Sequence, residues 1–234
     1  MKHTLLSTIL GAAIMIVCMG LFDNKPKQST PKKRVNEIAL EHLEEKYGEK
    51  FEYSAPAGSS YTGTRTFLAT CESFSDHRIL VQIKNFRDRE NMVIRDNYIA
   101  VKYADKVEEF FSQIADEEFG SSKVFCHATG RTLPPELPSN ASLEDYFSCR
   151  EGVVAGLIVL PESGYKNDEQ LSLLANKISD TFSFDELSVL FMVVDDDTFK
   201  SADEDELRDI FRTESPIAKL RLYRYKGNTK LEED

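Results

Sequence analysis

The sequence predicts a single α+β domain in which helices pack on a mixed or mostly antiparallel sheet, preceded by an N-terminal hydrophobic anchor helix. Residues 51–94 contain several short segments of strand character, and residues 96–225 alternate helical patterns with strands. Two continuous apolar runs, residues 152–160 and 187–194, have the length of strands that are covered on both faces. We therefore expect these two strands at the centre of the sheet.

The first expected element is a helix over residues 35–47, because its apolar side chains share one stripe and Gly48 follows where a helix end favours glycine. Strand patterns follow at residues 51–53, 65–71, 78–84 and 92–94. The small, polar segment 55–64 between the first two strands is expected to be a loop. It is also the first place to look for ligand contact, because functional residues favour loops.

Asp96 is expected to cap a long amphipathic helix that ends at Gly120. Two further helices are predicted from capping boxes, one at Asn167 and Gln170 and one at Ser201 and Glu204. The remaining expected elements are strands at 123–127 and 218–225, a short helix at 142–147 and a Pro-rich loop at 129–140.

The N-terminal run from Leu5 to Phe22 contains no charged side chain. Its length lies at the lower edge of the roughly 17–25 residues that cross a bilayer as a helix. A cleaved signal peptide is disfavoured, because apolar sequence continues past the small residues 11–13. Lipidation at Cys18 is the alternative, although Val17 is large for the position next to such a site. We prefer an uncleaved transmembrane anchor over residues 1–22, so that the membrane is the first expected partner.

Residues 23–36 are polar and basic and contain two prolines, which predicts a flexible linker. Residues 37–228 are expected to form the globular domain, with a frayed tail over 229–234. The basic linker would favour the cytoplasmic side by the positive-inside rule, but long domains are translocated largely regardless of charge. An N-terminal anchor with a basic tip and a large acidic domain behind it predicts that the domain lies on the extracytoplasmic side.

The net charge of the chain is −11, and six of the seven charged residues before Val35 are basic, so residues 35–234 are strongly acidic. Phosphate contacts dominate nucleic-acid affinity, and an acidic domain is therefore not expected to bind nucleic acid. A basic protein partner is compatible with this charge. Apart from Cys18, the cysteines are Cys71, Cys126 and Cys149, and an odd set does not predict a disulfide framework.

Chemical motifs are sparse. Asp195, Asp196 and Asp197 follow an apolar strand, and such oxygen ligands suit a hard cation, but a charged strand exit that leads to the next helix is the simpler explanation. Cys126 and His127 are adjacent on an expected strand, so their side chains point to opposite faces and do not form a nucleophile–base pair. We therefore predict no catalytic residues and no cofactor, with the three aspartates as a candidate metal site.

The segment LEEKYGEKFEY at residues 43–53, followed by Asp96, Asn97 and Tyr98 before a long helix, resembles uncharacterised membrane-anchored or lipoprotein-like small proteins of Firmicutes. The resemblance covers mainly residues 35–111 and implies a bacterial exported protein.

These observations favour a non-catalytic, membrane-tethered domain that binds a protein or a cell-envelope component. Its expected contact surfaces are the segments 55–64 and 129–140. One alternative is a hydrolase-type enzyme that uses a cysteine and a histidine or an Asp-bound metal. Another is a component of a secretion or pilus assembly, in which the anchor is the working element.

Overall fold

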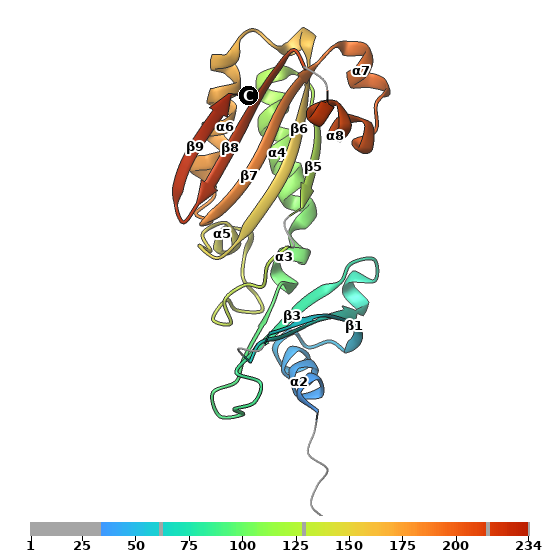
Figure 1. Cartoon of the computed structure of the whole chain (residues 1–234), viewed down its shortest axis with the longest axis vertical. Helices are drawn as coiled ribbons and strands as arrows, with labels where there is room; N and C mark the ends of the chain where they lie inside the picture. The colour runs from blue at the N-terminus through green and yellow to red at the C-terminus, as the bar shows by residue number, and fades with distance from the viewer. Residues whose placement is uncertain (1–33, 61–62, 128–129, 214–215, 234) are drawn as a thin grey trace, which may run out of the picture. The chain divides into compact units, whose positions relative to one another are not determined.

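The computed structural model describes residues 34–60, 63–127, 130–213 and 216–233 (Figure 1). Residues Val35–Asp234 form one compact unit. The predicted anchor, with Cys18, and most of the linker lie outside the described residues and stay predictions. Within the described part of the chain, no helix is both long and apolar enough to cross a bilayer.

The strands form two sheets, where the sequence predicted one. The first sheet is antiparallel throughout and has the order β1 (Phe51–Ser59), β2 (Arg65–Cys71), β3 (Ile79–Lys84) and β4 (Val93–Asp96). The second has the order β5 (Lys123–His127), β6 (Val153–Pro161), β7 (Glu186–Val194), β8 (Ala218–Tyr225) and β9 (Asn228–Glu233). Its β6 and β7 are parallel and its other neighbours antiparallel. The α+β class is confirmed, whereas the single sheet was wrong.

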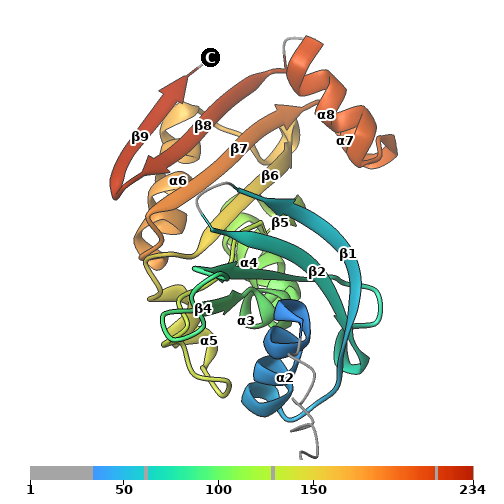
Figure 2. The same cartoon turned by 60° about the horizontal axis from the view of Figure 1, so that its bottom comes forward.

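The helices are α2 (Val35–Tyr47), α3 (Tyr98–Lys102), α4 (Ala104–Phe119), α5 (Leu143–Phe147), α6 (Asp168–Thr181), α7 (Asp196–Ser201) and α8 (Glu204–Thr213), with short 3-10 turns at Glu72–Phe74 and Glu162–Gly164. In the first sheet, α2 lies against one face, as Figure 2 shows. Ala39 and Leu43 on α2 are buried in the same apolar cluster as Phe51, Phe67 and Val81 of the strands. The stripe predicted for this helix is thus the stripe that it buries.

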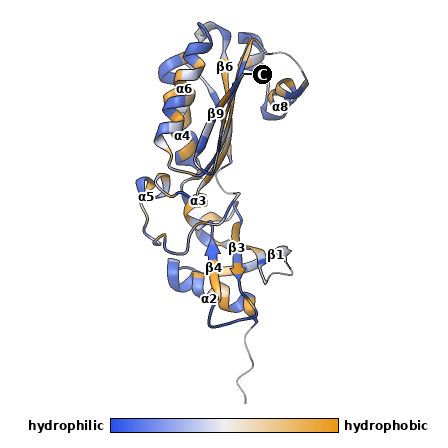
Figure 3. Cartoon of the chain, turned by 60° about the vertical axis from the view of Figure 1, so that its left-hand side comes forward, coloured by the Kyte–Doolittle hydropathy of each residue, from blue (hydrophilic) through white to orange (hydrophobic). Residues whose placement is uncertain are grey.

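The second sheet is covered on both sides over its central strands. Figure 3 shows it edge-on, with α4 and α6 to one side and α8 to the other. Side chains of β7 pack in two separate apolar clusters, because successive side chains of a strand point to opposite faces of the sheet. Phe191 and Val193 join the large cluster, whereas Met192 and Val194 join a smaller cluster with Leu207 of α8. The two apolar runs of the sequence are therefore central strands, as predicted.

Three predicted boundaries are corrected. The helix expected from Asp96 to Gly120 is two helices that meet at Tyr103, and Asp96 is the last residue of β4, although its carboxylate accepts a bond from the Tyr98 amide at 3.0 Å. The capping box of α8 is formed by Asp203 and Glu206, whose backbone amides and side chains exchange hydrogen bonds of 3.0 and 3.1 Å. It was misplaced because Ser201 instead ends α7.

The C-terminal end of the predicted globular domain also differs from expectation. Residues 228–233 form β9, which pairs with β8 from Tyr225↔Asn228 to Leu220↔Glu233, where the sequence predicted a frayed tail. The Lys226–Gly227 turn makes this hairpin possible, because both residues take positive φ values of 51° and 78°. Pairing across the hairpin, rather than local apolar pattern, stabilises this strand.

Candidate functional site

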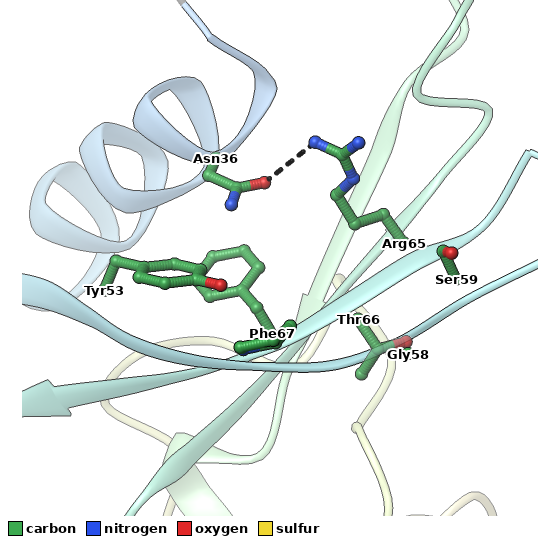
Figure 4. A pocket seen from close by; sticks show the side chains of 8 residues that line it. Asn36, Tyr53, Gly58, Ser59, Arg65, Thr66 and Phe67 are labelled. Carbon is green, nitrogen blue, oxygen red and sulfur yellow. Dashed lines mark hydrogen bonds between the residues drawn. The ribbon is translucent and has the colours of Figure 1, made fainter.

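A hollow of about 340 Å³ lies beside α2 on the first sheet (Figure 4). Its walls come from three elements: Asn36 of α2, Tyr53 and Ser59 of β1, and Arg65 and Phe67 of β2. Pro56, Gly58 and Thr66 complete the lining. The volume is near the lower end of the roughly 300–1,000 Å³ typical of small-molecule sites.

The hollow forms where β1 departs from regular pairing. β1 is the edge strand of its sheet, and its register with β2 shifts between Tyr53 and Ala55 and again between Pro56 and Gly58. Proline is tolerated on an edge strand because it needs to donate no ladder hydrogen bond there, and glycine often marks a bulge. Bulges bend a strand and redirect its side chains, which opens the space between β1 and α2. Residues 55–59 of the predicted loop 55–64 are thus part of an irregular strand.

Arg65 occupies the polar side of the hollow. Its Nη1 donates to the Asn36 Oδ1 at 3.5 Å, and its guanidinium lies over the Phe86 ring at 5.1 Å from the centroid. The Phe86 amide in turn donates to the Gly63 carbonyl at 3.1 Å, which joins the β3–β4 loop to the β1–β2 loop. Stacking on an aromatic face orients the guanidinium before any ligand arrives.

Tyr53 occupies the opposite, aromatic side. Its side chain is 44% exposed, and its ring lies 5.5 Å from that of Phe67, which is 1% exposed. Figure 4 shows the two rings side by side, with Arg65 reaching toward Asn36. A buried ring that supports an exposed one gives a firm apolar surface, and an exposed tyrosine offers a hydroxyl together with a ring face.

A buried polar joint holds α2 in place beside this hollow. The carboxylate of Asp96, which is 4% exposed, accepts from the Tyr47 hydroxyl at 2.7 Å and from the Lys46 ammonium at 3.2 Å. The Tyr47 ring stacks on Tyr98 at 3.9 Å between centroids. Burial, followed by the charge of Asp96, raises the pKa of Tyr47 far above its usual value. The tyrosine therefore stays protonated and donates to the carboxylate.

The three predicted metal residues begin the short helix α7, with Asp195 as its cap and Asp196 and Asp197 in its first turn. The Asp195 carboxylate accepts from the amides of Asp197 and Thr198 at 3.1 and 2.9 Å, and the Thr198 hydroxyl lowers the pKa of Asp195. Asp196 accepts from the Ser163 amide at 3.1 Å. Over the residues that the structure describes, no group of three His, Cys, Asp or Glu side chains is arranged to hold a metal ion.

Burial opposes ionisation of the three described thiols. Cys71, Cys126 and Cys149 are unpaired, with Cys71 buried and the other two half-buried. Burial and then the charge of Glu108 raise the pKa of Cys126 to about 12, and burial also raises the pKa of Cys71 and Cys149. His127 is on the same short strand as Cys126 and lies 3.3 Å from the Arg208 guanidinium instead. A raised pKa disfavours the thiolate that cysteine chemistry needs.

The Pro-rich segment has a structural role. The Leu133 amide donates to the Asp96 carbonyl at 2.7 Å, and Arg95 donates to the carbonyls of Thr132 and Leu133 at 3.2 and 3.1 Å. Thr132 and Leu133 are buried by these contacts. This part of the expected contact surface is therefore occupied by the chain itself.

The sequence predicts ligand contact at the segment that contains Pro56, Gly58 and Ser59, but it does not predict the other walls of the hollow. Asn36 falls where the expected helix 35–47 overlaps the end of the expected linker 23–36, and Arg65 and Phe67 lie on an expected strand, so none of the three is predicted to contact a ligand. Proline and glycine close together in an expected loop were the available signal, because both mark irregular edge strands. No signal in the sequence joins Asn36 to Arg65, since their contact spans the packing of α2 on the sheet.

No protein-family model matches the chain, and no curated protein matches it. A solved structure with partial likeness is the crystal structure of a DUF5037 family protein from Ruminococcus gnavus ATCC 29149. The identity is 15%, the match covers 86% of this chain and 95% of that chain, and the TM-score is 0.39. A TM-score of this size does not establish a shared fold, so no residue role is carried over from that protein.

Proposed function

We propose that this protein is a non-catalytic binding domain, tethered to a membrane by residues 5–22 on the extracytoplasmic side. It recognises a protein or a cell-envelope component through the hollow between α2 and β1. The observation that carries the proposal is this hollow, in which Tyr53 and Arg65 present an exposed ring and an oriented guanidinium. A ligand site is usually lined by apolar and aromatic side chains together with a small number of polar groups that converge on the ligand.

The chemistry of the remaining candidates supports binding over hydrolysis. The thiols of Cys71, Cys126 and Cys149 have raised pKa values, which opposes nucleophilic attack. The carboxylate of Asp195 is engaged by the first turn of α7. Asp195 is thus occupied as a helix cap, whereas the hollow offers the exposed ring of Tyr53 and the guanidinium of Arg65.

Site-specific photocrosslinking tests the binding site. A photoreactive residue in place of the exposed Ser59 should yield a crosslinked product in intact cells that carry the full chain. The same residue in place of the exposed Ser183, which follows α6, is the matched control and should yield none. Tyr53→Ser should abolish the product from position 59. Equal products from both positions, or none from position 59, would contradict the proposal.

Thiol labelling tests the membrane side. A membrane-impermeant thiol reagent, applied to intact cells under mild unfolding conditions, should label Cys71, Cys126 and Cys149 from outside. Labelling that requires lysis would place the domain in the cytoplasm and overturn the extracytoplasmic assignment. The crosslinking result is independent of this outcome.

A further inference from the structure

Two arginines share one aromatic ring beside the hollow. The guanidinium of Arg65 lies 5.1 Å from the centroid of Phe86, and that of Arg87 lies 5.6 Å from the same centroid. Phe86 is half-buried and fixed by its backbone bond to Gly63. Two like charges that gather on one ring raise the local positive potential, although the chain as a whole carries −11.

Neither cation is neutralised by an acidic side chain within the described residues. Arg95, Arg131, Arg150, Arg208 and Arg212 each form an ion pair with a carboxylate, but Arg65 and Arg87 form none with any residue that the structure describes. Arg65 makes one hydrogen bond there, to the Asn36 amide oxygen at 3.5 Å. A guanidinium carries five N–H donors in a planar fork, so most of its capacity is left for a ligand.

Asp88, the acidic residue next to Arg87, forms hydrogen bonds within the β3–β4 loop. The Asp88 carboxylate accepts from the Asn91 side-chain amide at 2.7 Å and from the Glu90 amide at 3.2 Å. The Asn91 amide also lowers the pKa of Asp88. This carboxylate is therefore held within the β3–β4 loop by its own neighbours.

We propose that the hollow takes a small ligand bearing an anionic oxygen group, a carboxylate or a phosphate, which Arg65 binds and Arg87 attracts. The uncharged part of the ligand lies against the Tyr53 ring, and the Ser59 hydroxyl borders the same space. A guanidinium fork matches the two oxygens of either group. A hollow of about 340 Å³ suits a group the size of an amino acid. This inference rests on the proposed binding function and names its ligand class.

Isothermal titration of the full chain in detergent micelles tests the ligand class with three probes. These are N-acetylphenylalanine, which carries a carboxylate, its uncharged amide, and phenyl phosphate. At least one of the two anions should bind at least tenfold more tightly than the amide. Arg65→Gln should weaken that binding at least tenfold, and Arg87→Gln about threefold, since Arg87 acts through its charge. Arg150→Gln, an exposed arginine near the second sheet, is the matched control and should change nothing.

The outcomes separate the two proposals. Binding of the carboxylate alone or of the phosphate alone supports the inference and identifies the source of the anion. Equal binding of the amide, or anion binding that survives both Arg65→Gln and Arg87→Gln, overturns it. If neither anion binds while crosslinking from position 59 persists, the anionic ligand is wrong and the binding function stands. Thermal melting of each variant checks folding. If Arg65→Gln melts at a lower temperature than the unaltered chain, the variant Arg87→Gln still tests the proposal, because Arg87 is exposed.

Discussion

The two sheets of this protein are built by different means. The second sheet buries apolar side chains on both faces of β6 and β7, between α4 and α6 on one side and α7 and α8 on the other. The first sheet has α2 on one face, where Ala39 and Leu43 pack in the apolar cluster and Lys46 and Tyr47 also bond to the buried carboxylate of Asp96. The pairing of its edge strand β1 with β2 contains two register shifts, whereas β6 and β7 of the second sheet pair without any.

This difference accounts for the hollow between β1 and α2. The second sheet also bears a hollow, of about 460 Å³, over the part of β7, β8 and β9 lined by Ser188, Leu190, Arg221, Tyr223 and Glu232. Regular strands covered on both faces fill their space with their own side chains, as protein interiors do. A bulged edge strand with one helix beside it leaves space that the chain does not fill. The second sheet is therefore expected to supply most of the stability, and the first sheet to supply the recognition surface.

The largest effect is expected from truncating the core of the second sheet. Phe191→Ala removes a fully buried ring between β7 and the α4–α6 layer. It should lower the free energy of unfolding by about 3–5 kcal/mol, because the lost burial adds to a cavity. Urea unfolding of the full chain followed by circular dichroism measures it. Tyr223→Ala, at an exposed aromatic of the same sheet, should cost under about 1 kcal/mol. Similar losses for the two variants would contradict the prediction that buried side chains of the second sheet supply most of the stability.

A smaller loss is expected in the polar joint of the first sheet. Asp96→Ala leaves the Lys46 ammonium, whose side chain is 15% exposed, without its carboxylate. It should cost about 3 kcal/mol, the low end for breaking a buried ion pair. Lys46→Met added to Asp96→Ala should recover part of this loss, because the unpaired charge is then gone.

Hydrogen exchange on Asp96→Ala sharpens the comparison between the sheets. Amides of β2 and β3 should lose protection, while those of β6 and β7 keep it, because stability differs between regions of one fold. Uniform loss across both sheets would show that they open together and would remove the contrast drawn above.

The smallest effect is a pH dependence. Burial raises the pKa of Cys126 to about 12, above the roughly 8.5 of an exposed thiol, so the folded state holds this proton more tightly than the unfolded state. Its contribution to stability is complete below about pH 8.5 and is lost as pH rises toward 12.

Cys126→Ala measures this contribution. The free energy of unfolding of the unaltered chain should fall more steeply between about pH 9 and 11 than that of Cys126→Ala, by at most about 1.4 kcal/mol per pH unit. Cys71→Ala in the first sheet is the comparison, and its change in slope should be smaller, because Cys71 has the smaller rise in pKa. Parallel pH profiles for the unaltered chain and Cys126→Ala would show that the thiol contributes nothing.

Most individual elements could be predicted from the sequence. The helix over 35–47, the strands at 65–71 and 123–127, and the short helix at 142–147 are confirmed, because each depends on periodicity or on a side chain within a few residues. The capping contact of Asn167 with the Gln170 amide, at 3.1 Å, is confirmed for the same reason. These signals are local, and the structure repeats them.

The candidate site was only partly predictable. The sequence indicates the segment with Pro56 and Gly58 as a contact surface, but predicts it as a loop, because its small polar residues lack the alternation of a strand. Its pairing with β2 supplies hydrogen bonds that no local pattern reveals. The role of Arg65 depends on Asn36 and Phe86, which come from different elements.

The sequence by itself determined the α+β class, the two central strands and the acidic character of the domain, because apolar period and charge are properties of the chain. Only the tertiary structure decided that the strands divide into two sheets, that residues 228–233 pair as β9, and that Asp195 caps a helix. The same is true of the hollow beside Arg65. Each of these depends on which backbone groups find partners far along the chain, and packing rather than local preference selects those partners.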